Sequence, residues 1–177
     1  MYELSGASVL LDASSSEDNL RMEAWIAKLE YDWDERYYLA ANYRRDGSSR
    51  FAASRRWGDF WSVSASWRLS NEDFMKDVGW VDNLKIRASY GTQGNDNIGT
   101  YYAWQGVYAS GWNDIAHSGY LVGSLPTPDL TWEKNAQLNI GVDAGLFNRL
   151  ELSVDYFRRV TRDLLFWRDL PPSSGIG

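Results

Sequence analysis

The stretch FWSVSASWRL, residues Phe60–Leu69, separates into two faces when every second residue is taken. One face is apolar and consists of Trp61, Val63, Ala65, Trp67 and Leu69. The other is small, hydroxylated and finally cationic, and consists of Ser62, Ser64, Ser66 and Arg68. Strict alternation of this kind predicts a β-strand that lies between an apolar environment and a polar one.

The same alternation recurs along the chain. In LKIRASY, Lys85 and Arg87 lie on the polar face, and in AQLNIGVDAGL the polar face includes Asn139 and Asp143. Three further segments have the same period of two, at residues 23–33, 36–44 and 150–156. The sequence therefore predicts an all-β chain of about six to eight long, amphipathic, antiparallel strands.

The connections between these segments differ in length. Asp34-Glu35 and residues 147–149 are short links, whereas 45–58 and 91–130 are long excursions, the latter with room for one more strand near YYAWQGVY. Residues 70–83 predict one short helix capped by Ser70 or Asn71, and Asp46-Gly47 predicts a tight reversal. In an antiparallel sheet the two long excursions fall at one end, which is the pattern of an outer-membrane barrel.

Composition excludes several classes of function. The formal charge of −6 argues against nucleic-acid binding, and the absence of cysteine excludes disulfides and thiolate metal sites in this chain. No metal or cofactor is expected, because His117 is the only histidine and GTQGNDNIG lacks the Lys-Ser/Thr ending of a phosphate loop. His117 beside Ser118 is not enough for a catalytic triad, so the chain is expected not to be an enzyme.

The apolar faces are compatible with two environments. Trp or Tyr residues lie near the ends of several faces, as in the aromatic girdles of membrane barrels. Trp25 to Trp33 spans roughly 26 Å along a strand, or about 20 Å of height at a tilt of about 40°, near the apolar band of a barrel. Trp61 and Trp67 are only about 15 Å apart by the same arithmetic. A soluble β-sandwich, with the apolar faces packed together, stays open on this evidence.

Two loop clusters are candidates for contact with a ligand. The aromatic residues of TYYAWQGVYASGW are able to stack on sugar rings or peptide side chains, or to pack loops together, and they are Tyr101, Tyr102, Trp104, Tyr108 and Trp112. The second cluster is basic, and its expected role is structural pairing with acidic loop groups. Its members are Arg44, Arg45, Arg50, Arg55 and Arg56.

Several long blocks resemble the SusC/RagA family of TonB-linked outer-membrane transporters. They are YRRDGSSRFAASRRWGDFWSVSASWRLSNEDFM, LKIRASYGTQGN, PDLTWEKNAQLNIGVDAGLF, YFRRVTRDLLF and LPPSSG, in the order of the family. The resemblance covers roughly Ala24 to the end of the chain. Trp61 stands where the family usually has proline, and a bulky aromatic residue there suits a position that faces lipid.

The resemblance implies that residues 1–177 are part of a TonB-dependent receptor β-barrel domain. It implies an internal piece of the later half of the barrel, without the signal peptide, TonB-contacting segment, plug and closing strand. The short helix then lies in a periplasmic turn. Trp61, Val63, Ala65, Trp67 and Leu69 are expected to face lipid. The side chains expected to face the lumen are Ser62, Ser64, Ser66, Arg68, Lys85, Arg87, Asn139 and Asp143.

The same resemblance implies a function and partners. The whole protein is expected in the outer membrane of a Bacteroidetes-type Gram-negative cell, where it imports glycan or peptide fragments with energy delivered through TonB. The implied partners are a SusD-like surface lipoprotein, TonB, an oligosaccharide or peptide substrate and outer-membrane lipid. The alternative function is a soluble β-rich carbohydrate-binding module with an aromatic platform, and an enzyme ranks last.

Overall fold

The computed structural model describes residues 17–110, 117, 119–169, 171 and 173. Most of them form one six-stranded antiparallel sheet with the strand order β1-β2-β3-β4-β7-β8. The strands are β1 (Met22–Trp33), β2 (Tyr37–Ser48), β3 (Trp57–Arg68), β4 (Val81–Asn95), β7 (Glu133–Leu146) and β8 (Leu150–Arg162). A separate two-stranded hairpin, β5 (Val107–Ser110) and β6 (Tyr120–Ser124), extends from the long-loop end.

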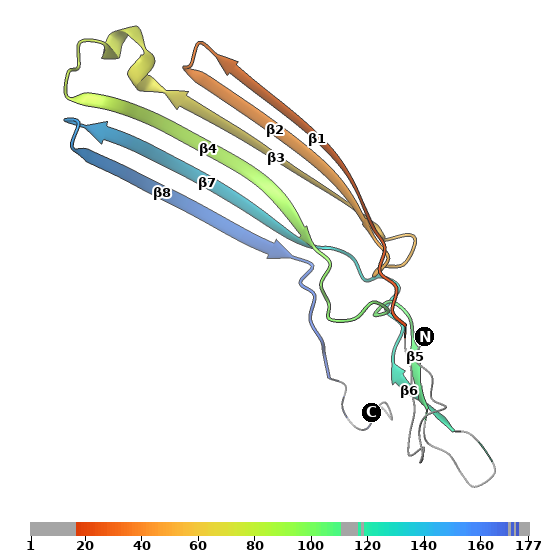
Figure 1. Cartoon of the computed structure of the whole chain (residues 1–177). Helices are drawn as coiled ribbons and strands as arrows, with labels where there is room; N and C mark the ends of the chain where they lie inside the picture. Colours follow the sequence, from red (N-terminus) through yellow and green to blue (C-terminus); the bar gives the residue numbers. More distant parts are fainter. Residues whose placement is uncertain (1–16, 111–116, 118, 170, 172, 174–177) are drawn as a thin grey trace, which may run out of the picture.

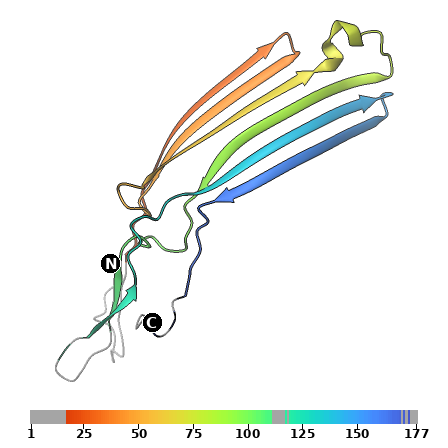
Figure 2. The same ribbon diagram turned by 180° about the vertical axis from the view of Figure 1, so that it is seen from behind.

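The sheet is strongly curved, and β1 and β8 form its two edges within the described residues (Figures 1 and 2). The all-β antiparallel class and the strand number of six to eight are confirmed, because each alternating segment forms a strand, apart from its terminal residue Arg36 or Leu69 in two cases. β4 runs past the alternating segment to Asn95, since Gly91–Asn95 pair with β7 despite their polar composition. Among the described residues, no helix combines the length and apolar character needed to cross a bilayer.

The expected reversal at Asp46-Gly47 is wrong. Both residues lie inside β2, where Asp46 pairs with Ala24 on one side and Gly58 on the other. The carboxylate of Asp46 also lies 2.6 Å from Nε of Arg44. Ladder bonds to two neighbouring strands thus override the local turn preference, and the chain leaves the sheet only after Ser48.

Short turns join the strands at one end of the sheet. The β1–β2 and β7–β8 links use left-handed backbone at Asp34, Glu35, Phe147 and Asn148, with φ values of 55°, 53°, 58° and 50°. Two successive left-handed residues match the twist of the flanking strands, which explains these tight hairpins.

The β3–β4 connection contains two single turns of 3₁₀ helix, η2 (Leu69–Asn71) and η3 (Asp73–Met75), at the top of Figure 1. The expectation of one helix capped by Ser70 or Asn71 is wrong. The residues at the N-cap positions are Arg68 and Glu72, and neither makes a side-chain capping bond. β3 ends at Arg68, so Leu69 begins η2 and does not continue the strand face.

A small aromatic core ties the loops together at the opposite end. Phe51, Phe60 and Trp132 are 0–4% exposed, and the ring centroids of Phe60 and Trp132 lie 5.5 Å apart. The indole N–H of Trp132 donates to the carbonyl of Arg56 at 2.9 Å. Phe60 occupies space that only glycine leaves open, since a Cβ on Gly58 would lie 2.7 Å from its ring. The β2–β3 loop is thereby fixed to the start of β7.

Candidate functional site

The apolar face of the sheet is exposed over its whole width. Trp25, Leu29, Val63 and Val154 have exposed fractions of 64%, 70%, 47% and 59%. Across the described residues, the buried apolar side chains are confined to the loop end of the sheet, at Phe51, Ala52, Phe60 and Trp132. An apolar surface of this extent marks contact with a partner or a membrane, because water does not stabilise it.

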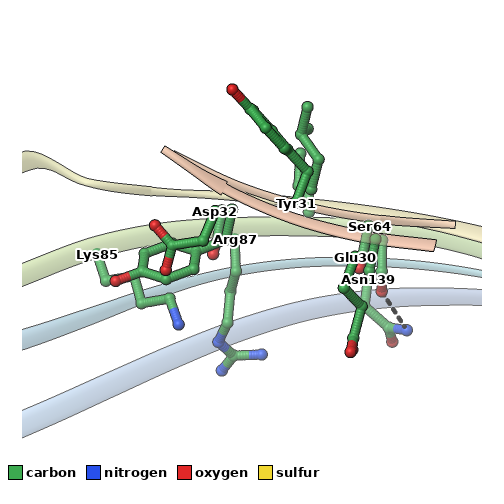
Figure 3. A pocket seen from close by; sticks show the side chains of 14 residues that line it. Glu30, Tyr31, Asp32, Ser64, Lys85, Arg87 and Asn139 are labelled. Carbon is green, nitrogen blue, oxygen red and sulfur yellow. Dashed lines mark hydrogen bonds between the residues drawn. The ribbon is translucent and has the colours of Figure 1, made fainter. Parts of the chain in front are cut away.

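The opposite face carries a hydrogen-bonded polar surface. Glu30, Asp32, Lys85, Arg87 and Asn139 project from one side of the sheet, and Tyr31 projects from the other (Figure 3). Together with serines of β3 and β4 they line a concavity of about 510 Å³. Neighbouring strands are joined across this face, for example by Asn42 Nδ2 to Ser62 Oγ at 3.2 Å and by Asn139 Nδ2 to Ser89 Oγ at 3.3 Å.

Arg87 is the centre of an ion-pair cluster on this polar face. Its Nε lies 3.0 Å from Asp143 Oδ2 on β7, and its Nη2 lies 2.7 Å from Asp155 Oδ1 on β8. Ser153 donates its hydroxyl to Asp143 at 2.6 Å. One guanidinium thus connects three strands, and its planar set of donors suits two carboxylates at once.

A second cationic group on the polar face surrounds Tyr38. The guanidinium of Arg68 lies 5.6 Å from the Tyr38 ring centroid, and Nζ of Lys85 lies 5.4 Å from it. Both distances are within the range of cation–π attraction. The structure therefore brings Arg68 and Lys85 together. Their assignment to a lumen remains a prediction.

The four loop aromatics that the structure describes do not form one platform. Tyr101 and Tyr102 lie together, with centroids 6.5 Å apart, and the Arg50 guanidinium lies 5.2 Å from the Tyr101 ring centroid. Trp104 is partly buried, whereas Tyr108 on β5 is 72% exposed. Within the described part of the loop, no ring contact joins Tyr108 to the other three, and Trp112 lies outside the described residues. Their contact with a ligand remains a prediction.

The basic loop cluster is largely paired, as expected. Arg44 lies 2.6 Å from Asp46, Arg50 lies 3.6 Å from Asp96, and Arg55 lies 3.8 Å from Asp129.

Arg45 lies 3.8 Å from Asp59, and its guanidinium lies 5.4 Å from the centroid of the Trp57 ring. The backbone carbonyl of Arg56 accepts the Trp132 indole bond. These arginines therefore organise the loop end of the sheet.

Glu72 organises the aromatic residues at the short-turn end. Its Oε1 accepts hydrogen bonds from the Tyr37 hydroxyl at 2.8 Å and from the Trp67 indole N–H at 2.9 Å. The rings of Tyr37 and Trp67 stack with centroids 6.0 Å apart, and Trp33 follows at 6.3 Å from Tyr37. The hydrogen bond from Trp67 has the larger effect and that from Tyr37 the smaller one, and both lower the pKa of Glu72 below its usual value.

Sequence reasoning missed Glu72 and Asp155 of these clusters, and Gly141, which lies between Arg87 and Asp155 in the register. Glu72 is expected only as part of a helix, and Asp155 and Gly141 are expected only as part of strands. A usable signal for the Arg87 cluster was the short β7–β8 link, which places Gly141 opposite Asp155. No comparable signal marks Glu72, because its partners lie on two different strands.

A family model described as "TonB dependent receptor-like, beta-barrel" matches residues 4–177. The chain belongs to this family. TonB-dependent receptor P39 of Formosa agariphila is 40% identical over 156 residues, which cover 88% of the chain and 15% of the relative. TonB-dependent receptor SusC of Bacteroides thetaiotaomicron is 35% identical over 150 residues, which cover 80% of the chain and 15% of the relative.

A solved structure has the same fold as this TonB-dependent receptor chain. One chain in the structure of the RagAB peptide transporter aligns with the present protein with a TM-score of 0.81 and 32% sequence identity. The alignment covers 89% of the present protein and 17% of the RagAB chain. A second structure, the RagAB peptide importer in the "open-open" state, aligns over 99% of the chain with a TM-score of 0.79. The resemblance to SusC/RagA proteins is therefore confirmed, and the chain spans about a sixth of the length of these relatives.

Proposed function

We propose that this chain is a wall segment of an outer-membrane transporter that imports glycan or peptide fragments with energy delivered through TonB. The observation that carries the proposal is the two-faced sheet of a TonB-dependent receptor, whose exposed face is apolar and whose opposite face is polar and internally bonded. A barrel needs this arrangement, because lipid solvates one side of its wall and water the other.

In this proposal, the polar face with Ser64, Arg87 and Asn139 lines the lumen, and the apolar face with Trp61 and Val63 contacts lipid. The edges β1 and β8 pair with further strands, since unpaired backbone groups are too costly in hydrocarbon. The soluble carbohydrate-binding module is not favoured, because no described segment covers the apolar face.

The long-loop end faces the cell exterior, and the short turns with η2 and η3 face the periplasm. A SusD-like surface lipoprotein covers the exterior mouth, and the loop aromatics Tyr101, Tyr102, Trp104, Tyr108 and Trp112 contact the substrate. Support comes from the naming of related proteins as SusC and as a peptide importer. The aromatic composition of this loop suits either sugar rings or peptide side chains.

Transport and substrate contact are tested with the full-length receptor that contains this chain. Uptake of labelled oligosaccharides and peptides is measured in cells with and without TonB, and we expect uptake only with TonB. Equal uptake without TonB would contradict the transport proposal.

The aromatic contacts are tested by W104A/W112A, with F74A as a control because Phe74 is 63% exposed in the short-turn region. Loss of two stacking tryptophans is expected to weaken ligand affinity about tenfold or more, whereas F74A is expected to leave it unchanged. Unchanged affinity and uptake in W104A/W112A would remove these two residues from the site.

A further inference from the structure

Two cations face each other on the apolar side of the sheet at its long-loop end. Lys134 on β7 is the direct register partner of Arg162 on β8, and both side chains are exposed. Lys134 lies at the long-loop end of the outward row of β7, next to Ala136. Arg162 lies at the same end of the outward row of β8, next to Val160. Arg158 lies on the same outward row of β8, two residues before Val160.

These cations have no compensating partner in the described structure. None of the ion pairs or side-chain hydrogen bonds of the described residues involves Lys134, Arg158 or Arg162. Like charges directly opposite in a sheet repel each other. By contrast, the outward charges of Asp59 and Arg45 at the same end are satisfied, since Asp59 accepts from the Tyr43 hydroxyl at 2.6 Å and lies 3.8 Å from Arg45. The uncompensated pair therefore favours an anion as its partner.

The position of the pair fits the edge of the apolar band. Ala136 to Leu146 spans about 33 Å along β7, or about 25 Å of height at a tilt of about 40°, which is the height of the apolar band in a barrel. Lys134 and Arg162 lie just beyond that span. Arg158 lies within it, and the long arginine side chain is able to extend its charged end to the interface.

We propose that Lys134 and Arg162, assisted by Arg158, bind the phosphate of an anionic lipid headgroup in the leaflet next to the long loops. This inference rests on the proposed membrane orientation. Charge complementarity selects the ligand, because two cations above an apolar wall match a phosphate above acyl chains. Lysine and arginine near a membrane surface each contribute favourably to the binding of anionic lipid.

The chain offers a control matched in residue type and charge. Lys85 on β4 and Arg159 on β8 are likewise a lysine and an arginine, but they lie on the polar face. There Lys85 contacts the Tyr38 ring, and Arg159 Nε donates to Asn135 at 3.3 Å. K134Q/R162Q and K85Q/R159Q therefore remove the same charge from opposite faces of the sheet.

The test uses the full-length receptor in phosphatidylcholine nanodiscs that contain phosphatidylglycerol as a minor component. Native mass spectrometry measures the phosphatidylglycerol retained after gentle release from the nanodisc. We expect K134Q/R162Q to weaken retention about tenfold, and K85Q/R159Q to match the wild type. Uptake by K134Q/R162Q is measured in parallel, so that a failure of transport is distinguished from a failure of lipid binding.

Three results would overturn the inference. Retention by K134Q/R162Q equal to that of the wild type would show that the pair binds no lipid. An equal loss in both double variants would show an effect of net charge only. Full displacement of phosphatidylglycerol by inorganic phosphate at the same concentration would show a free-anion site without a contribution from the acyl chains.

Discussion

The guanidinium of Arg87 on β4 contacts the carboxylate of Asp155 on β8 at 2.7 Å, although β7 lies between the two strands. The residue between them in the register is Gly141, which pairs with Arg87 on one side and Asp155 on the other. The missing side chain of Gly141 leaves the space that the ion pair occupies. The glycine thus allows the two side chains to meet directly across its surface.

Replacement of Gly141 by alanine is expected to destabilise the sheet. The new Cβ would lie 2.6 Å from both Cζ of Arg87 and Oδ1 of Asp155, so the two groups must separate. Both groups are the ends of flexible, partly exposed side chains, so the expected cost is that of a weakened surface ion pair, about 0.2–1 kcal/mol. The measurement is urea-induced unfolding of the full-length receptor in detergent micelles.

The control for this change is Gly145→Ala on the same strand. A Cβ at Gly145 meets its nearest atoms at an ordinary 3.5 Å. G145A is therefore expected to leave the unfolding free energy nearly unchanged. Equal losses in G141A and G145A would show that the space above Gly141 has no special role.

Acid is expected to release Glu72 from Tyr37 and Trp67. Their hydrogen bonds lower the pKa of folded Glu72 below its ordinary value of 4.5. The carboxylate therefore stabilises the fold fully above pH 4.5, and this contribution is lost as the pH falls through the lower pKa of the folded state.

The measurement is the thermal unfolding midpoint of wild type and E72Q as a function of pH. Glutamine keeps the size of Glu72 without the charge, so the advantage of the wild type should be constant above pH 4.5 and should shrink below it. An advantage that does not change with pH would contradict the role of the carboxylate charge.

Trp132 is expected to hold the β2–β3 loop in place. W132A removes a side chain that is 3% exposed and packs on Phe51 and Phe60, at a cost of about 3–5 kcal/mol. W132F keeps a ring in the core but loses the indole bond to Arg56, at a cost of about 1 kcal/mol, and part of the packing, so its stability lies between that of the wild type and that of W132A.

Limited trypsin cleavage after Arg55 and Arg56 in the full-length receptor measures the opening of this loop. Cleavage should be fastest in W132A, intermediate in W132F and slowest in the wild type. The same cleavage rate in all three proteins would show that Trp132 does not secure the loop.

The alternation of polar and apolar residues predicted the strands, because successive side chains of a strand point to opposite faces of the sheet. Contacts between distant strands could not be predicted in this way. The Arg87–Asp155 pair depends on the register of three strands, and the core of Phe51, Phe60 and Trp132 depends on where two loops cross. The same limit explains Asp46-Gly47, whose turn preference was overridden by pairing on both sides.

The loop aromatics show a second limit. Their composition made them candidates for ligand contact or for packing between loops, but side-chain grouping depends on the path of a long loop. Tyr101 and Tyr102 pack together beside Arg50, whereas Tyr108 projects from the separate β5–β6 hairpin. A run of aromatic residues in sequence therefore identified candidates without their arrangement in space.

The central claim is that alternate residues of β3 face opposite environments, so that Val63 faces lipid and the next residue, Ser64, faces water. The chain has no cysteine of its own, so V63C and S64C are suited to nitroxide labelling in the full-length receptor with other cysteines replaced. Collision rates with oxygen, which concentrates in lipid, and with a nickel chelate, which stays in water, are measured in membranes. Position 63 should collide mainly with oxygen and position 64 mainly with nickel. Nickel-dominated collisions at both positions would contradict the account.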